Sequence, residues 1–267
     1  QRAGDVRTIV LDKTGTVTEG KPTVTDLVAV ISGDEQPLLG QVAALEAMSE
    51  HPLADAIVRA AKESGAVMGT AEGFASVTGK GVTGVVDGAA LAVGNAALMA
   101  DYAIDVAPLE ADAARLADAG RTPMFVARDG ALAGLLAVAD PIKDTSRTAI
   151  QRMHALGLEV VMLTGDTERT AKAIAKEAGI ERVVAGVLPE GKVAEVKRLQ
   201  AEGKVVAMVG DGINDAPALA QADVGMAIGT GTDIAAEAAD VVLMRGDLRA
   251  AGQAVELSRR TMATMKQ

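Results

Sequence analysis

The stretch DKTGT at residues 12–16 carries the residue types that phosphoryl transfer requires. It follows an apolar, β-branched run at residues 6–11, which predicts a buried strand with Asp12 at its carboxyl end. Ligands bind at that edge of an open parallel sheet, and a carboxylate beside hydroxyl residues and a glycine suits a nucleophile that attacks phosphorus. Aspartate at a strand end is also a common turn former, so the pentapeptide alone leaves both interpretations open.

Other polar residues follow later predicted strands or begin a predicted helix. One group follows a strand predicted at residues 158–163, another follows a strand at 205–209, and a lysine lies just inside a helix at 189–201. Because the carboxyl ends of parallel strands share one edge of a sheet, we expect these side chains to converge on Asp12. The residues concerned are Thr164, Lys192, Asp211, Asn214 and Asp215.

Phosphoryl transfer depends mainly on positioning and on neutralising charge, and each group supplies part of this. The Thr164 hydroxyl suits a phosphoryl oxygen, and Lys192 lies near a helix amino end, where only a nearby anion makes a cation favourable. Asp12, Asp211 and the backbone carbonyl of Thr14 are the expected ligands of one Mg²⁺, because unneutralised carboxylates repel one another. A solvent-exposed lysine and simple turns are the alternatives for each group alone, but their order and strand-end placement together favour a catalytic site.

The elements that must position these residues form two predicted domains. From residue 140 onward, strands and glycine-terminated helices alternate, which predicts a doubly wound parallel sheet with helices on both faces. The strand before Asp12 needs that sheet as its partner, so residues 1–20 and 138–267 form one α/β domain. Residues 21–137 are a mixed block of short strands and helices, and we expect them to be an inserted α+β domain.

Composition limits the classes of function. The net charge is −10 with no cluster of basic residues, so nucleic-acid binding is disfavoured. Cysteine is absent, which excludes thiolate metal sites, and no apolar run approaches the ~20 residues that cross a bilayer. The chain begins without Met and ends in a basic, helical pattern, which indicates an excised segment.

Three motifs together resemble the signature motifs of the P-type ATPases: DKTGT at 12–16, TGD at 164–166 and GDGIND at 210–215. The phosphorylation domain of that family has the haloacid-dehalogenase-like fold. SEHP at 49–52, GKG at 79–81 and VGN at 93–95 further resemble the nucleotide-binding domain of the heavy-metal-transporting branch. The resemblance covers essentially the whole chain.

The resemblance implies a role for each matching residue. Asp12 would be phosphorylated by ATP, Lys192 and Thr164 would contact the phosphoryl group, and Asp211 would bind Mg²⁺. Thr14, Asn214 and Asp215 belong to the same catalytic motifs. In the inserted domain the residues implied to bind ATP are Glu46, His51, Gly79, Gly81, Gly94 and Asn95. Without the family match, a lone Gly-x-Gly or a lone histidine is a weak signal.

ADPIK at 139–143 and AIGTGTD at 227–233 resemble copper(I) pumps more than zinc or cadmium pumps, which stay open as the alternative. The resemblance implies a membrane parent with transmembrane, actuator and metal-binding domains, of which this chain would be a soluble, monomeric piece at the cytoplasmic face. A free-standing phosphatase of the same fold is less favoured, because such enzymes generally place a second aspartate where Thr14 stands. A non-catalytic nucleotide sensor is disfavoured because the nucleophile, lysine and metal carboxylates are all present.

Overall fold

The computed structural model describes residues 2–211, 213–229, 237–244 and 246–265. The chain divides into two compact units: unit 1 comprises Gln1–Gly20 and Pro141–Gln267, and unit 2 comprises Lys21–Asp140. Residues 138–140, which the sequence placed with residues 141–267, lie in unit 2. The reason is that strand β7 (Ala131–Ala139) stays paired with β2 (Thr23–Ala29) as far as the Thr23↔Ala139 pair.

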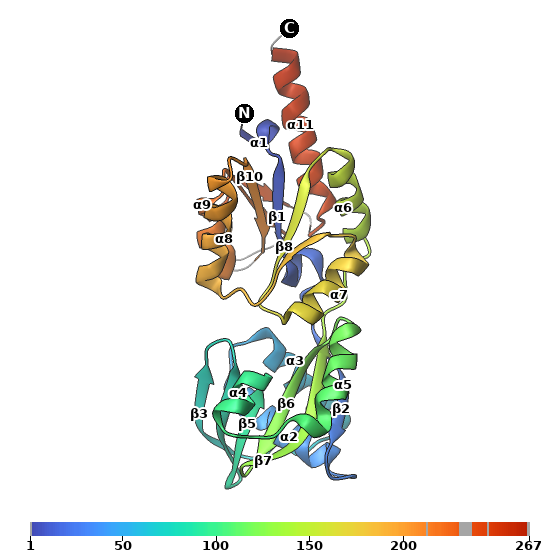
Figure 1. Cartoon of the computed structure of the whole chain (residues 1–267), viewed down its shortest axis with the longest axis vertical. Coiled ribbons are helices and arrows are strands. Elements are labelled where there is room, and N and C mark those ends of the chain that lie inside the picture. Colours follow the sequence, from blue (N-terminus) through green and yellow to red (C-terminus); the bar gives the residue numbers. More distant parts are fainter. Residues whose placement is uncertain (1, 212, 230–236, 245, 266–267) are drawn as a thin grey trace. The chain divides into compact units, whose positions relative to one another are not determined.

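Unit 1 is a parallel sheet with helices on its two faces (Figure 1). Its strands are β1 (Thr8–Asp12), β8 (Glu159–Leu163), β9 (Arg182–Val184), β10 (Val206–Gly210), β11 (Val224–Ile228) and β12 (Val241–Leu243). Its described helices are α1 (Arg2–Asp5), α6 (Ser146–Ala155), α7 (Glu168–Ala178), α8 (Pro189–Ala201), α9 (Ala216–Gln221) and α11 (Arg249–Met265), with the short turns η1 (Lys13–Val17) and η2 (Ile213–Asp215).

The strand order β12-β11-β10-β1-β8-β9 puts β1 in the interior of the sheet, between β10 and β8. All five β1 residues are buried, and their side chains alternate between two cores. Ile9 and Leu11 pack in the core that includes residues of α6, α7 and α11, whereas Val10 packs with residues of α8 and α9. The sheet is therefore covered on both faces, as the near-continuous apolar pattern predicted.

Unit 2 is built on an antiparallel sheet of order β2-β7-β6-β5-β4-β3. Its further strands are β3 (Ala71–Val77), β4 (Gly81–Val86), β5 (Ala89–Gly94) and β6 (Thr122–Arg128). Its helices are α2 (Glu35–Glu46), α3 (Pro52–Ser64), α4 (Ala96–Asp101) and α5 (Ala107–Asp118). Residues of α2 and α3 share one core with the sheet, and residues of α4 and α5 share the other. This is the α+β fold expected of the insertion.

Short elements are where the sequence was least informative. Strand β9, with three residues, and helix α9, with six, were not predicted, although β12 and α4 are equally short and were predicted at residues 241–244 and 95–101. The sequence pattern predicts strands at residues 75–77 and 23–31; in the structure β3 begins four residues earlier than the first, and β2 ends at Ala29, two residues before the end of the second. Ile31 is 63% exposed and lies in the bend that leads to α2, so its apolar side chain did not mark a strand position.

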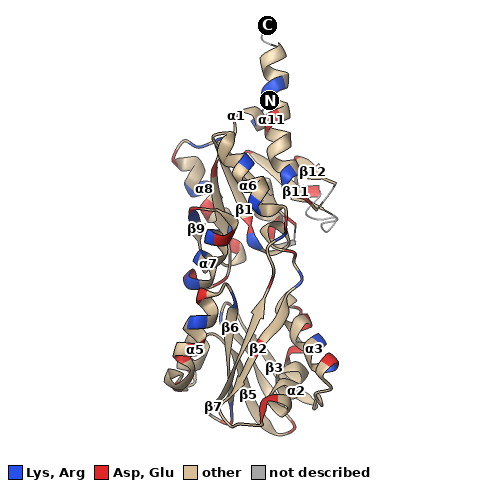
Figure 2. Ribbon diagram, turned by 90° about the vertical axis from the view of Figure 1, so that its right-hand side faces the viewer, with Lys and Arg blue, Asp and Glu red and all other residues tan. Residues whose placement is uncertain are grey.

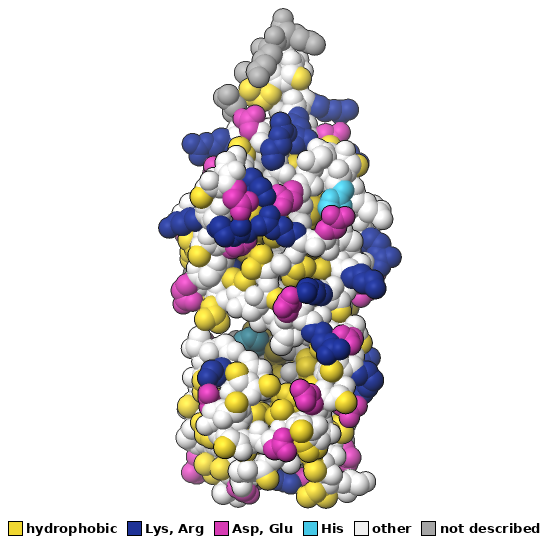
Figure 3. Space-filling model, in the orientation of Figure 1, with side chains coloured by type: hydrophobic (Ala, Val, Ile, Leu, Met, Phe, Trp, Pro, Cys, Tyr) yellow, Lys and Arg dark blue, Asp and Glu magenta, His cyan; other side chains and the backbone are white. Residues whose placement is uncertain are grey.

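Charged residues of both signs lie along the surface of unit 1. Basic and acidic residues both lie on α7 and α8 (Figure 2), and they are interspersed on the face of unit 1 seen in Figure 3. Some form helix-surface pairs, such as Lys172 with Glu168 at 2.6 Å, which contribute little to stability. None of the helices in the described part of the chain has the length and apolar character that crossing a bilayer takes.

Candidate active site

Asp12 is the last residue of β1 and lies where the neighbouring strands also end. It pairs in register with Leu163, the last residue of β8, and the preceding Leu11 pairs with Val209 near the end of β10. The side chain is almost fully buried, at 6% exposure for the residue. A carboxylate in this position sits at the ligand-binding edge of a parallel sheet.

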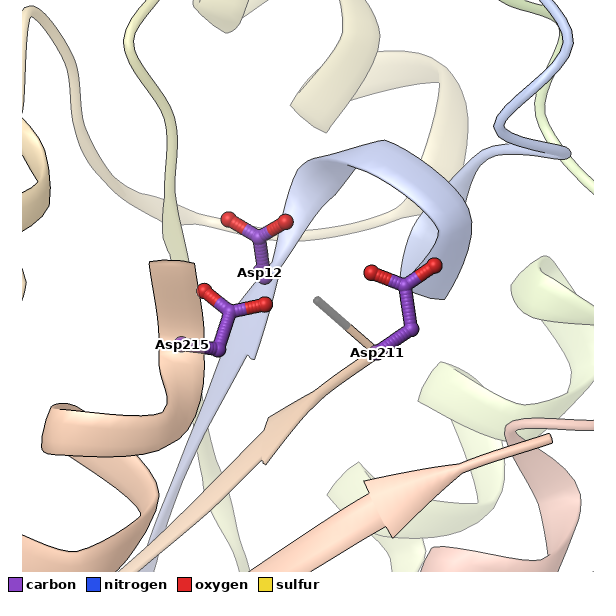
Figure 4. Close-up of side chains that lie close together, drawn as sticks. All are labelled: Asp12, Asp211 and Asp215. Atoms are coloured by element: carbon purple, nitrogen blue, oxygen red, sulfur yellow. The ribbon is translucent and has the colours of Figure 1, made fainter. Parts of the chain in front are cut away.

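Two more carboxylates meet Asp12 there. Asp211 follows β10 and Asp215 ends η2, and one oxygen of each of the three side chains lies within 4.8 Å of the others. Figure 4 shows the three side chains close together, with their carboxylates pointing to the same side. Gly210 permits this packing, because a Cβ there would lie 2.6 Å from Asp215 Oδ2.

Lys192 supplies a positive charge to the cluster. It lies in the first turn of α8 and is buried, and its Nζ donates to Asp12 Oδ1 at 2.7 Å and to Asp215 Oδ1 at 2.6 Å. The helix amino end disfavours a cation, so these two carboxylates are what stabilise the ammonium group. The sequence predicted that an anion would be near Lys192 but did not predict that protein carboxylates would already hold it.

The pKa values reflect an excess of buried negative charge. Burial, and then the Asp215 carboxylate, raises the pKa of Asp12 to about 7, although Lys192 acts in the opposite direction. Burial and Asp215 likewise raise the pKa of Asp211 to about 6. Desolvation would lower the pKa of Lys192, but Asp12 and Asp215 raise it overall. The pKa values of Asp12 and Asp211 stay raised although Lys192 and, at Asp211, Lys143 act against the rise, so a further cation would be stabilised here.

The donor set fits Mg²⁺, which prefers a few carboxylate oxygens together with phosphate and water oxygens. Asp12 and Asp211, two of the three expected ligands, belong to the cluster. The third, the carbonyl of Thr14, belongs to the peptide that joins Thr14 to Gly15. A Cβ on Gly15 would lie 1.6 Å from Asp211 Oδ2, so the Asp211 carboxylate lies directly against this backbone.

Thr164 and Asp166 form a second, smaller arrangement after β8. The Thr164 hydroxyl donates to Asp166 Oδ2 and accepts from the Asp166 amide, both at 3.1 Å. Asp166 also pairs with Lys13 at 2.8 Å, and each of these two side chains is 11% exposed. The sequence assigned no role to Lys13 or Asp166, although both lie inside quoted motifs. This ion pair links the turn after β1 with the turn after β8.

Of the remaining motif residues in unit 1, Asn214 is described by the structure and others are not. Asn214 lies in η2 beside the buried Asp215 but is itself exposed. Gly212 of the same motif, and residues 230–233 of the copper-like motif, lie outside the described residues.

In unit 2, Glu46 and His51 lie on either side of the short connection between α2 and α3. Glu46 ends α2 and is buried, and burial raises its pKa to about 7 although Ser49 hydrogen-bonds it. His51 is exposed and caps α3, its Nδ1 accepting from the Leu53 amide at 3.2 Å.

The glycine motifs of unit 2 come together at the ends of β4 and β5. Asn95 Nδ2 donates to Gly79 O at 2.9 Å, and Asn95 Oδ1 caps α4 by accepting from the Leu98 amide. Gly81 and Gly94 are paired across the two strands, and a Cβ on Gly81 would lie 2.6 Å from Gly94 Cα. Close backbone packing is therefore one reason for glycine at both positions.

Comparison with known proteins agrees with this architecture. The family model for haloacid dehalogenase-like hydrolases matches residues 6–223. Copper-transporting ATPase 1 of Rhizobium meliloti (strain 1021) is 52% identical over 266 residues, which is 100% of this chain and 32% of that protein. This chain thus spans about a third of the curated relatives it matches.

Two solved structures are also similar. The catalytic domain of the CPx-ATPase CopB-B, from a study of conformational changes on nucleotide binding, is 30% identical with a TM-score of 0.73. The match covers 97% of this chain and 90% of that one. A zinc-transporting PIB-type ATPase in its E2.Pi state is 39% identical with a TM-score of 0.69, over 100% of this chain and 43% of that one.

Proposed function

This chain belongs to the haloacid dehalogenase-like hydrolases and, within them, to the catalytic domains of the P-type ATPases, and from that premise we propose that ATP phosphorylates Asp12 in a Mg²⁺-dependent step. The observation that carries the proposal is the buried cluster in which Lys192 bridges Asp12 and Asp215 beside Asp211. Such a cluster combines a nucleophile with the charges that phosphoryl transfer needs.

In this reaction a carboxylate oxygen of Asp12 forms a bond to the γ-phosphorus of ATP. The bond from that phosphorus to the β–γ bridging oxygen breaks, and ADP leaves. Lys192, already 2.7 Å from the attacking carboxylate, places its charge where the transferring oxygens will lie. Asp12, Asp211 and the Thr14 carbonyl would hold Mg²⁺, which supplies positive charge against the negative charge that gathers during transfer.

Thr14 favours an intermediate that persists. A carboxylate at this position could act as the general base that activates water against the aspartyl phosphate, whereas a threonine hydroxyl has no such basicity. Loss of that base slows hydrolysis, so the phosphate would stay on Asp12 long enough to drive another process. This is the property expected of a pump rather than of a phosphatase.

Unit 2 is the proposed ATP-binding part. Glu46 and His51 would contact the nucleotide near the α2–α3 connection, while Gly79, Gly81, Gly94 and Asn95 would let it approach the backbone of β4 and β5. Support comes from the clustering of the last four residues, in which the Asn95 side chain reaches Gly79 and the two strand glycines touch.

The parent protein would be a copper(I) pump. Support comes from the copper-transporting relative, which is 52% identical, against 39% for the zinc-transporting structure. Its transmembrane, actuator and metal-binding domains would be the partners of this chain, which would work at the cytoplasmic face of the membrane.

Labelling with [γ-³²P]ATP and Mg²⁺ tests the proposed function. The wild-type chain should acquire an acid-stable label that hydroxylamine removes, and Asp12→Asn should abolish it. Asp5→Asn, at an exposed position in α1, is the matched control and should label like wild type. Persistent labelling of the Asp12 variant would overturn the mechanism.

A further inference from the structure

The turn that follows Asp12 is fastened to a segment more than 120 residues away in sequence. Ile142 forms an antiparallel bridge with Thr18, and the Lys143 amide donates to Val17 O at 3.1 Å. The buried Ser146 hydroxyl donates to the same Val17 carbonyl at 2.7 Å. The backbone around residue 143 is therefore fixed beside the DKTGT turn.

From this fixed position the Lys143 side chain reaches into the turn itself. Its Nζ donates to Gly15 O and, at 3.1 Å, to Gly246 O. Gly15 adopts a left-handed conformation with φ +72°, and its Cα lies against the Asp211 carboxylate. Gly15 is thus held by Lys143 through its carbonyl and bounded by Asp211 at its Cα.

Holding the Gly15 carbonyl also restrains the residue before it. The held carbonyl lies in the peptide plane between Gly15 and Thr16, and the plane that carries the Thr14 carbonyl is joined to it through the two backbone dihedral angles of Gly15 alone. Glycine has the widest backbone freedom, so without an external bond this turn would sample several conformations. Lys143 supplies a bond that limits this freedom at the point where the metal ligands meet.

We propose that Lys143 is a positioning residue for the Mg²⁺ site: by holding the Gly15 carbonyl it keeps the Thr14 carbonyl and Asp211 in the arrangement that binds the ion. This role rests on the proposed Mg²⁺-dependent function. Groups that orient metal ligands without touching the metal typically change metal affinity by about 10–100-fold when they are removed.

A purely electrostatic role for Lys143 makes the opposite prediction. Its positive charge lowers the pKa of Asp211, which means that it stabilises the ionised carboxylate. The same charge repels a divalent cation, so if charge were its only contribution, removing Lys143 would strengthen Mg²⁺ binding. The sign of the change in Mg²⁺ affinity therefore separates positioning from charge.

The chain is first treated with EDTA, and Tm is then measured as Mg²⁺ alone is added. The quantity compared between variants is the Mg²⁺ concentration that gives half of the maximum rise in Tm. Lys143→Met should raise that concentration roughly 10-fold. Lys143→Arg keeps the donors and the charge and should stay close to wild type. Arg147→Met removes a nearby cation that bonds Glu177 O instead, and it should also stay close to wild type.

Lys143→Gln keeps an uncharged donor and serves if the methionine variant does not fold. Positioning predicts that it binds Mg²⁺ no more tightly than Lys143→Arg, whereas charge alone predicts tighter binding. Equal or tighter Mg²⁺ binding by a folded Lys143→Met variant would overturn the inference and leave the proposed function intact. A wild-type chain whose Tm does not respond to Mg²⁺ would overturn both.

Discussion

Asp12 and Asp211 of unit 1 differ in their electrostatic surroundings from His51 and Asn95 of unit 2, whereas the buried Glu46 of unit 2 has a raised pKa, as Asp12 does. In unit 1, Asp12 and Asp215 are buried with Lys192 between them, and the pKa of Asp12 is raised to about 7. In unit 2, His51 and Asn95 are polar side chains whose hydrogen bonds already cap helices. Replacing the Asp211 carboxylate can relieve repulsion while it removes a metal ligand, whereas replacing His51 or Asn95 removes a hydrogen bond that is already satisfied.

Among these comparisons, replacement of Lys192 should change the rate of phosphorylation most. Lys192→Met should reduce phosphorylation of Asp12 by roughly 100-fold or more, because it removes a preorganised charge from the reacting group. It should also destabilise the metal-free chain, because two buried carboxylates lose their counter-charge. Initial rates of ³²P labelling and Tm in EDTA measure the two effects. Lys197→Met, on the same helix, is the control, and equal rates in the two variants would contradict the role of Lys192.

A smaller effect is expected in unit 2. His51→Gln should weaken ATP binding about 10-fold, by calorimetry, because the imidazole contact is lost while the connection between α2 and α3 is kept. Phosphorylation of Asp12 by acetyl phosphate should be nearly unchanged, since that donor does not need a nucleotide site. An equal loss with both donors would show that the two sites are not separable.

The smallest effect is on thermal stability. At pH 8 one substitution in unit 1 should raise Tm, whereas one in unit 2 should lower it. Because the pKa of Asp211 is raised from 3.8 to about 6, the folded chain keeps a proton that the unfolded chain releases, and this stabilisation is lost as the pH rises through 6. Asp211→Asn in EDTA should therefore raise Tm at pH 8, by about 2–4 °C for about 1 kcal/mol, and have little effect near pH 4.

Asn95→Ala is the matched comparison in unit 2. It removes a helix cap and should cost about 1 kcal/mol at both pH values. Thermal unfolding at the two pH values measures both variants. A lower Tm for Asp211→Asn than for wild type at pH 8 would contradict repulsion between the Asp211 and Asp215 carboxylates in the metal-free chain.

The convergence of the unit 1 residues was predictable because it depends on topology alone. Once residues 6–11 and 205–209 are recognised as parallel strands, Asp12 and Asp211 must lie at one sheet edge. The direct bonds from Lys192 were not predictable, because they depend on how far α8 lies from β1. The bond from Lys143 to the Gly15 carbonyl was missed for the same reason: no sequence pattern marks a side chain that binds a distant backbone oxygen.

Most helices and strands were predicted in their order along the chain, including those of the α+β insertion, whereas β9 and α9 were missed. A short element gives few residues from which a period can be read, so its detection depends on the turn residues around it. The close approach of Gly81 to Gly94 also has no signal in a single sequence, because two glycines in neighbouring strands have many possible explanations.

Strands β2 and β7 begin and end unit 2 as hydrogen-bonded neighbours, with Thr23 opposite Ala139, and the Lys21 amide donates to Asp140 Oδ1 at the same point. For unit 1 the whole insertion is thus a loop whose two ends are already closed by the insertion's own folding. The pairing of β2 with β7 then offsets the entropy lost on closing this long loop, so the contacts of β1 and α6 do not have to offset it. A parallel sheet of this kind can therefore carry such a module between two of its elements with little loop-closure cost of its own.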